Sequence, residues 1–376
     1  MKHIENSEEF EGLSVMKGVV QPPIINPYLQ HKKRKEYSVA EFVDGILKGD
    51  MVLLSRAVTL IESANPEHYA QAQEVIEKCL PYASNSVRLG ITGVPGAGKS
   101  SLIEKLGLHI VEQKRKLAVL AIDPSSERTK GSILGDKTRM EELSRSENAF
   151  IRPSPSAGSL GGVARKTRET IVLCEAAGFN TIIVETVGVG QSETAVHSMV
   201  DFFLLLQLAG TGDELQGIKR GIMEMADGIA INKTDGNNVE RALAARTMFQ
   251  NALKLFPAPE SNFPPEVLNC SAQENTGIAA VWEMITHYTQ FTKQNGFFDK
   301  NRNRQANYLM YSAIDESLHS QFYQNEQVKI LLKQYEEKIK NNQISSFMAA
   351  QEVLQFFLKH QHQRSQHTTA VNACCI

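Results

Sequence analysis

Short apolar runs alternate with amphipathic stretches through the middle of the chain. An apolar run bounded by turn-forming residues is typical of a buried strand, and apolar positions three and four residues apart are typical of a helix. The predicted strands are Val87–Thr92, Lys116–Ile122, Ala149–Arg152, Thr181–Glu185, Asp201–Leu206, Gly228–Asn232 and Val267–Cys270. Helical patterns fill most of the gaps, so the sequence predicts an α/β fold within residues 85–295, with a mostly parallel sheet covered by helices on both faces.

The residues before this core also have a helical pattern. Val39, Phe42 and Ile46 share one face of the first predicted helix, and similar spacing continues to about residue 81. We therefore predict an N-terminal helical subdomain over residues 37–84. Residues 1–36 show no clear periodicity, so we expect a loosely ordered extension whose basic run, Lys32–Lys35, is a solvated charge cluster rather than a targeting or binding patch.

The chain beyond residue 280 is helical and polar, and apolar stripes run along it. The first stripe contains Trp282, Ile285, Tyr288 and Phe291, and further stripes follow as far as Phe357. Such stripes pack either on their own domain or against a second subunit. Residues 359–376 combine irregularly spaced His and Cys with Ser, Gln and Thr, so we predict a disordered tail there rather than a metal site.

Composition and charge limit the function. The 376-residue chain has 40 Lys and Arg against 42 Asp and Glu, which gives no reason to expect a nucleic acid or an anionic membrane as partner. No apolar run is long enough to span a membrane, and the acidic N-terminus lacks the pattern of a signal or transit peptide. The five cysteines show no C-x-x-C spacing. We therefore expect a protein of a reducing compartment, the cytoplasm.

A glycine-rich segment, residues 93–100, directly follows the first predicted strand and precedes a helical run. Its sequence GVPGAGKS has the G-x-x-x-x-G-K-S spacing of a P-loop, in which backbone N–H groups surround a phosphate and glycines permit the tight turn. Lys99 is predicted to contact the β and γ phosphates, and Ser100 to bind Mg²⁺. The sequence thus predicts a P-loop nucleoside triphosphatase.

A second motif, NKTD at residues 232–235, stands at the end of another predicted strand. The carboxylate of Asp235 would accept from the N1–H and the exocyclic amine of guanine, a pair of donors that adenine lacks. Lys233 would pack over the base, and Asn232 would tie this loop to the P-loop. The Ser-Ala pair at residues 271–272 matches the second base-contacting loop of GTPases. Together these features favour GTP over ATP.

Acidic residues follow several other predicted strands. Glu185 ends one of them, and Gly188 in the next loop is placed to sense the γ phosphate through its N–H. Asp123 closes the strand 116–122, and Asp136 lies in a glycine-containing loop. Each is a candidate Mg²⁺ ligand, outer-shell base or water-positioning residue, or else a helix cap or surface carboxylate. No Gln directly follows Gly188, so we expect slow intrinsic hydrolysis.

Long segments of the chain resemble the methylmalonyl-CoA mutase-associated GTPases. This family was formerly labelled as arginine/ornithine transport kinases and is related to the nickel-insertion GTPases. The segments are DPSS (123–126), GSILGDKTRM (131–140), IRPSPSAGSLGG (151–162), VETVGVGQSE (184–193), GDELQGIKRG (212–221) and NKTD (232–235). The resemblance extends from about Val39 to the C-terminal helices.

The resemblance implies a homodimeric GTPase that binds an adenosylcobalamin-dependent mutase, gates loading of its cofactor and protects it, with hydrolysis stimulated by that partner. The loops 123–139 and 185–193 resemble switch I and switch II, and 210–219 resembles a further switch that relays the nucleotide state to the mutase. Glycines in these loops give the backbone freedom that switching needs. Residues 296–358 resemble the family's dimerisation arm, so we expect the apolar stripes beyond residue 280 to be buried against a second subunit.

Motifs and resemblance together define the candidate site. For GTP the residues are Gly93, Val94, Pro95, Gly96, Ala97, Gly98, Lys99, Ser100, Ser101, Gly188, Asn232, Lys233, Asp235, Ser271, Ala272 and Gln273. The candidate Mg²⁺ ligands are Ser100, Asp123, Asp136 and Glu185. The candidate catalytic residues are Lys99, Asp136 and Glu185. The sequence leaves open which acid is catalytic, which acyl-CoA mutase is served and how the dimer is arranged.

Some positions depart from the family pattern. Glu127–Lys130 replaces small residues, Leu208 and Ala209 stand where relatives often have proline, and Arg168 stands where Asn is common. None of these departures removes a phosphate or base contact. All lie on predicted surfaces that could face a partner.

Two rival functions fit a P-loop. A nickel-type metallochaperone should carry Cys or His ligands near the switch loops, and Cys174 is the only Cys or His between Asp123 and Thr186. A P-loop kinase of a transport system would need an acceptor pocket, and the NKTD motif selects GTP. We therefore favour assistance to a cobalamin enzyme.

Overall fold

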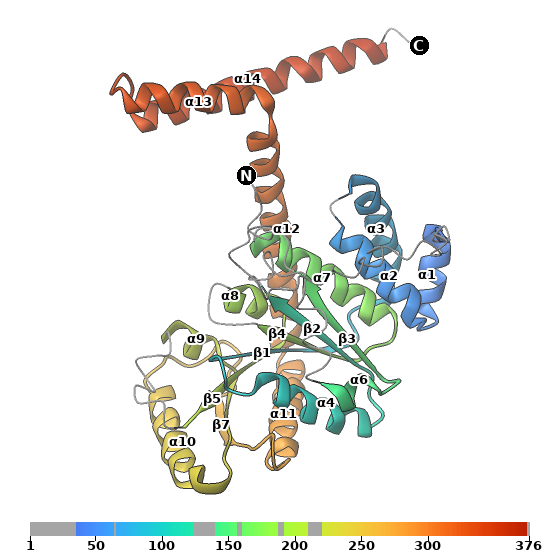
Figure 1. The fold of residues 1–376 in the computed structure, drawn as a ribbon, viewed down its shortest axis with the longest axis vertical. Coiled ribbons are helices and arrows are strands. Elements are labelled where there is room, and N and C mark those ends of the chain that lie inside the picture. Colours follow the sequence, from blue (N-terminus) through green and yellow to red (C-terminus); the bar gives the residue numbers. More distant parts are fainter. Residues whose placement is uncertain are drawn as a thin grey trace, which may run out of the picture. The chain divides into compact units, whose positions relative to one another are not determined.

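Strands and helices alternate along most of the chain in the computed structural model of the protein (Figure 1). The structure describes residues 35–63, 65–123, 140–155, 160–186, 192–209 and 220–373. All elements belong to the unit Val39–Ile376. They are α1 (Val39–Leu47), α2 (Met51–Glu62), α3 (Pro66–Cys79), η2 (Leu80–Tyr82), β1 (Val87–Gly93), α4 (Lys99–Glu112), β2 (Leu117–Asp123), α6 (Glu141–Ser144), β3 (Ala149–Pro155), α7 (Leu160–Ala176), β4 (Thr181–Thr186), α8 (Ser192–His197), β5 (Phe202–Leu208), α9 (Arg220–Met225), β6 (Gly228–Asn232), η3 (Gly236–Asn238), α10 (Val239–Leu253), β7 (Glu266–Asn269), α11 (Ile278–Gln294), α12 (Phe297–Gln324), α13 (Glu326–Lys340) and α14 (Ser346–Ala373).

All the predicted strands are present, and they pair in parallel in the order β3-β2-β4-β1-β5-β6-β7. This confirms the predicted α/β fold. Only β3 is clearly longer than predicted, because its pairing with β2 continues to Asp123 and Pro155. A proline is tolerated there because β3 is an edge strand of the sheet.

The central strands are buried along almost their whole length. β4 is buried at all six positions, and β5 is buried at six of its seven. A parallel sheet is covered by helices on both faces, so both faces of its strands must be apolar. β1 lies between these two strands and therefore in the middle of the core.

Helices α4 and α11 cover one face of the sheet. Leu102 and Leu106 of α4 share a buried cluster with Trp282 and Ile285 of α11 and with residues of the sheet. The expectation that the α11 stripe is buried against a second subunit is therefore wrong: Trp282, Ile285 and Tyr288 are at most 3% exposed within this one chain. The physical reason is that α11 begins shortly after β7 and lies directly over the chain's own sheet.

Helices α7, α8, α9 and α10 cover the opposite face (Figure 1). Alternation along β5 separates the two faces, because Leu204 and Leu206 belong to the cluster with α4 and α11, whereas Leu205 belongs to a cluster with α10. The approach of α8 to β1 leaves no room for a side chain at Gly90, where a Cβ would lie 2.9 Å from Val196.

The helical pattern predicted before the first strand is confirmed. Helices α1, α2 and α3 pack on one another and on α7. Side chains cap two of them: Asp50 accepts from the N–H groups of Val52 and Leu53 at 2.8 and 3.1 Å, and Asn65 accepts from the N–H of Glu67 at 3.0 Å. These caps satisfy N–H groups that have no partner within the helix.

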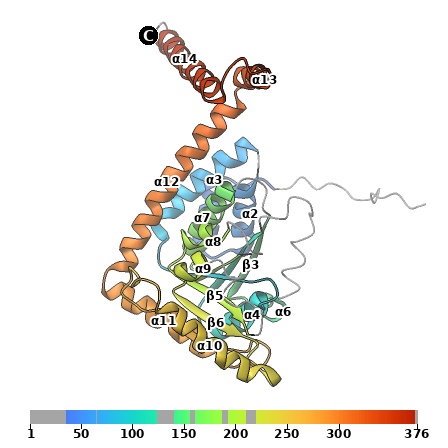
Figure 2. The same ribbon diagram turned by 90° about the vertical axis from the view of Figure 1, so that its left-hand side faces the viewer.

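Figure 2 shows α12 leading from the end of α11 to the paired helices α13 and α14. Val328, Val353 and Phe357 form a small buried cluster there. The disordered tail predicted for residues 359–376 stays a prediction, and α14 is drawn as far as Ala373. No glycine or proline interrupts this stretch, so nothing in its sequence ends the helix early. Of the helices in the described ranges, none is long and apolar enough to cross a membrane.

Candidate functional site

The glycine-rich segment forms the loop between β1 and α4, and α4 begins at Lys99. The order of the strands reverses at β1: the chain first adds β2 and β3 on one side of it, and later β5, β6 and β7 on the other. In open α/β sheets, ligands bind at such a reversal, outside the carboxyl ends of the strands. The predicted phosphate loop therefore lies where this fold class binds its ligands.

Gly98 is a position in this loop that requires glycine. Its φ of +86° is in the left-handed region, and a Cβ there would lie 2.6 Å from Nδ2 of Asn232. The same Nδ2 donates a hydrogen bond to the carbonyl of Ala97 at 2.8 Å. Asn232 thus ties the NKTD loop to the P-loop through a contact that a side chain at residue 98 would block.

Lys99 is almost fully buried at the N-terminus of α4. Its Nζ donates to the carbonyl of Gly93 at 2.8 Å and to that of Val94 at 3.4 Å. Burial lowers the pKa of Lys99, and the charges of Glu185 and Glu193 act in the opposite direction. No role was predicted for the buried Glu193, because nothing in its spacing distinguishes it from the other polar residues of 185–193.

Ser100 and Glu185 bring two oxygens together beside the P-loop. Ser100 Oγ donates to Oε1 of Glu185 at 3.3 Å, and Glu185 is 5% exposed. Parallel pairing places Glu185 opposite Ile91, so β4 delivers its carboxylate to the loop that follows β1. A hydroxyl and a carboxylate are oxygen donors that suit Mg²⁺. The two residues therefore fit the predicted magnesium ion.

The other candidates around the phosphates cannot be placed in the same way. Asp123 is the last residue of β2, which pairs with β4, so its backbone lies at the same end of the sheet as Glu185. The structure does not describe its side chain. Asp136 and Gly188 lie outside the described residues, as do 124–139, 187–191 and 210–219, which contain most of the predicted switch loops. The roles of these residues stay predictions.

Two loops that follow β6 and β7 are fastened to each other at the predicted base site. Oδ1 of Asn232 accepts from the N–H of Ala272 at 3.1 Å. Ser271 Oγ donates to the carboxylate of Asp235. The carboxylate is thereby held by a neighbouring hydroxyl instead of turning freely in solvent, which favours a fixed geometry for reading a base.

Lys233 and Gln273 are exposed at the same place. Lys233 has φ +60°, a backbone conformation that a residue with a side chain adopts only where its surroundings hold it. One such contact is the side chain of Asn238, which donates to the carbonyl of Lys233 at 2.8 Å. Both exposed side chains are available to a ligand.

Known proteins are similar in sequence to this chain over most of its length. The family model described as methylmalonyl Co-A mutase-associated GTPase MeaB matches residues 54–327. A probable GTPase of Mycobacterium tuberculosis is 46% identical, over 83% of this chain and 94% of its own. The GTPase ArgK of Escherichia coli is 43% identical, over 85% of this chain and 97% of its own. The methylmalonic aciduria type A homolog, mitochondrial, of Mus musculus is 41% identical, over 84% and 80%.

A solved structure shares the fold. The crystal structure of a LAO/AO transport system kinase matches with a TM-score of 0.70 and 37% identity, covering 86% of this chain and 99% of that one. The fold is thus that of a P-loop GTPase, with helices before and after the sheet. Because the family model and the relatives cover most of the chain, we conclude that it belongs to the methylmalonyl-CoA mutase-associated GTPase family.

Proposed function

We propose that the protein binds GTP with Mg²⁺ and hydrolyses it to GDP and phosphate. The observation that best supports this is the side chain of Asn232, which bonds both to the P-loop and to the loop at residues 271–273. The loops predicted to bind phosphate and base are thereby joined to each other at one end of one sheet. The relatives named as GTPases support the same activity.

In this site the P-loop N–H groups and Lys99 would bind the β and γ phosphates, while Asp235 would bind guanine. Nζ of Lys99 already lies within the loop, where its bonds to the carbonyls of Gly93 and Val94 would give way to phosphate oxygens. A buried ammonium is weakly screened, so its attraction for the charge on the transferring phosphoryl group is strong.

Magnesium and water complete the proposed reaction. Mg²⁺, when bound, supplies positive charge beside the phosphate oxygens. Ser100 and Glu185 would hold it, with Asp123 and Asp136 as further candidates. Water then attacks the γ phosphorus in line with the leaving oxygen. Because no Gln directly follows Gly188 to orient this water, we propose slow turnover by the protein alone.

We further propose that the protein assists an adenosylcobalamin-dependent methylmalonyl-CoA mutase, gating cofactor loading and protecting the mutase. The family description supports this partner. The predicted switch loops begin after β2, β4 and β5, strands that lie beside β1 or one strand away. All three loops therefore start near the P-loop, where a γ phosphate can influence them.

Adding the methylmalonyl-CoA mutase of the same cell should accelerate GTP hydrolysis by at least about tenfold; activators that supply an arginine to the site reach about 10³–10⁵-fold. Phosphate release by the purified protein, with and without the mutase, measures this. A Lys99→Ala sample with mutase is the control for contaminating hydrolases. If the mutase does not change the rate of hydrolysis, the proposed partner is refuted but the GTPase activity stands. If no sample hydrolyses GTP, the proposed GTPase activity is refuted.

We also propose that α12–α14 mediate a homodimer. Tyr308, Tyr311, Ile314 and Leu318 follow one another at helical spacing on α12 and are 47–63% exposed. Their spacing places them on one face of the helix, and a second subunit would remove that apolar face from water.

The double substitution Ile314→Glu with Leu318→Glu should convert the dimer to a monomer, because it would bury two charges at the interface. Sedimentation velocity at micromolar concentration measures the change. Glu147→Lys, in the exposed turn before β3, is a matched control that also changes charge and should leave the dimer intact. A monomeric wild type, or a dimer that survives the double substitution, would argue against this face.

A further inference from the structure

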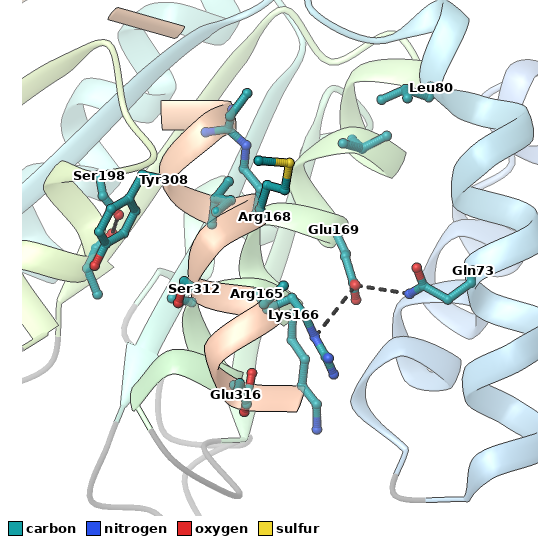
Figure 3. A pocket seen from close by; sticks show the side chains of 18 of the residues that line it. Gln73, Leu80, Arg165, Lys166, Arg168, Glu169, Ser198, Tyr308, Ser312 and Glu316 are labelled. Carbon is teal, nitrogen blue, oxygen red and sulfur yellow. Dashed lines mark hydrogen bonds and ion pairs between the residues drawn. The ribbon is translucent and has the colours of Figure 1, made fainter. Parts of the chain in front are cut away.

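A cavity of about 1360 Å³ lies between α3, α7 and α12 (Figure 3). Helix α7 supplies Arg165, Arg168 and Glu169 to its lining, and of the described residues none from the P-loop or the NKTD loop reaches it. Ligand sites in proteins commonly have volumes of about 300–1,000 Å³. The cavity is therefore large enough for a ligand and separate from the proposed GTP site.

Two arginines at this cavity are paired with carboxylates. Nε and Nη2 of Arg88 donate to the two oxygens of Glu175, both at 2.9 Å. Nε and Nη2 of Arg302 donate to Asp201 at 2.8 and 2.7 Å. Bidentate pairs of this kind neutralise one guanidinium with one carboxylate. Neither acid is left over for a third cation.

Arg168 is that third cation. Its Nη1 donates to the carbonyl of Met199 and to Oε1 of Gln305, both at a long 3.3 Å. Within the described ranges no acceptor is bonded to its Nε or Nη2, so three of its five N–H donors are unused. Burial lowers the pKa of Arg168 to about 10, and the charge of Arg88 acts in the same direction. The guanidinium is still charged at neutral pH.

The cluster thus contains three guanidinium groups and two carboxylates, and Arg168 is the guanidinium that forms no ion pair with either of the two carboxylates. Nη1 of Arg88, a side chain that is 4% exposed, also has no acceptor among the described residues. Buried charges without a partner are strongly unfavourable. An anion beside Arg168 would supply both the missing charge and the missing acceptors.

We propose that the cavity binds a small organic anion whose carboxylate or phosphate group is held by Arg168. Tyr69, Leu80 and Met310 are exposed apolar side chains on its walls and would contact the body of the ligand. The inference does not depend on the GTPase activity proposed above.

Acidic residues at the cavity limit the ligand to one compact anionic group. Glu169 accepts from Nε2 of Gln73 at 3.0 Å and lies 3.7 Å from Nε of Arg165, as Figure 3 shows. Glu77 and Glu316 line the cavity as well. Their charges would repel a polyanion that extends beyond Arg168, so a triphosphate or polyphosphate should bind poorly.

Calorimetry on the full chain at low ionic strength tests the proposal, with inorganic phosphate, butyrate and tripolyphosphate as probes. Excess GDP keeps the P-loop occupied, so that phosphate bound there is not counted. Phosphate or butyrate should bind, Arg168→Gln should weaken binding by at least about tenfold, and Arg168→Lys should restore most of it. Arg145→Gln, which removes an exposed guanidinium from the surface, should have no effect.

A second measurement does not require a variant. The same anions should protect Arg168 of the wild-type protein from an arginine-specific dicarbonyl reagent, as read by peptide mass spectrometry. Equal binding by wild type and Arg168→Gln, no binding of either phosphate or butyrate at about 10 mM, or unprotected Arg168 would each overturn the site. Preferential binding of tripolyphosphate would contradict the compact-anion specificity. GTP hydrolysis by Arg168→Gln should equal that of wild type, which separates this test from the proposed function.

Discussion

Replacing Lys99 with alanine should lower kcat/KM for GTP by about 10²–10³-fold. This loss is typical when one preorganised hydrogen-bond donor to the charge of the transition state is removed. Nζ of Lys99 lies inside the P-loop, bonded to the carbonyl of Gly93 at 2.8 Å, so a phosphate bound in the loop would meet it directly. Because the side chain is almost fully buried, water cannot replace its charge effectively. Single-turnover hydrolysis and fluorescent-nucleotide binding would measure the loss.

Lys105→Ala is the matched control for this variant. Lys105 also lies on α4, but its side chain is 30% exposed and forms a surface ion pair with Glu142 at 3.2 Å. Surface pairs contribute little, so its removal should leave kcat/KM unchanged within about twofold. If Lys99→Ala hydrolyses GTP at the wild-type rate, the phosphate site is assigned wrongly.

Replacing Asp235 with asparagine should weaken GTP binding by about 10²–10⁴-fold, because a polar site that cannot pair with its ligand rejects it strongly. An asparagine amide presents a donor toward the guanine amine where the carboxylate presents an acceptor. Xanthine has a carbonyl in place of that amine, so Asp235→Asn should bind xanthosine triphosphate better than GTP. Competition binding with GTP, ATP and xanthosine triphosphate would give the order of the three affinities.

Two further variants sharpen this result. Glu240→Gln changes an exposed carboxylate in the first turn of α10 and should leave the order of the nucleotide affinities unchanged. Ser271→Ala removes only the hydroxyl that holds Asp235, so a loss of about tenfold is expected. Survival of the preference for GTP over ATP in Asp235→Asn would rule out the base-reading role.

Local sequence was sufficient to predict the strands and to single out the two loops proposed to bind the nucleotide. β5 begins with five consecutive apolar residues and β4 contains three, Ile182–Val184, so burial of these runs on both faces could be predicted without knowledge of their neighbours. The P-loop is equally local, because all its residues lie within 93–101. Ser100 and Glu185 were both predicted as Mg²⁺ ligands, and the structure places their oxygens 3.3 Å apart.

The errors and omissions concern contacts between distant residues. The stripe of α11 has the same periodicity whether it faces its own sheet or a second subunit, so the pattern could not choose between them. The pair of Arg302 with Asp201 joins residues 101 positions apart, and no spacing rule indicates it. Arg168 was predicted on a partner-facing surface, but it lines a cavity beside that pair.

β1 is made early on the ribosome but acquires both of its neighbours late. Residues 94–180 separate it from β4, and β5 ends only at Leu208. At about 5–20 residues per second, translation takes several seconds to supply these two strands. Until β4 has been made, the strand has two unpaired edges, and one edge stays unpaired until β5 follows; unpaired edges are the condition under which chains associate wrongly. We expect the emerging polypeptide to depend on ribosome-bound chaperones until about residue 210 has left the exit tunnel.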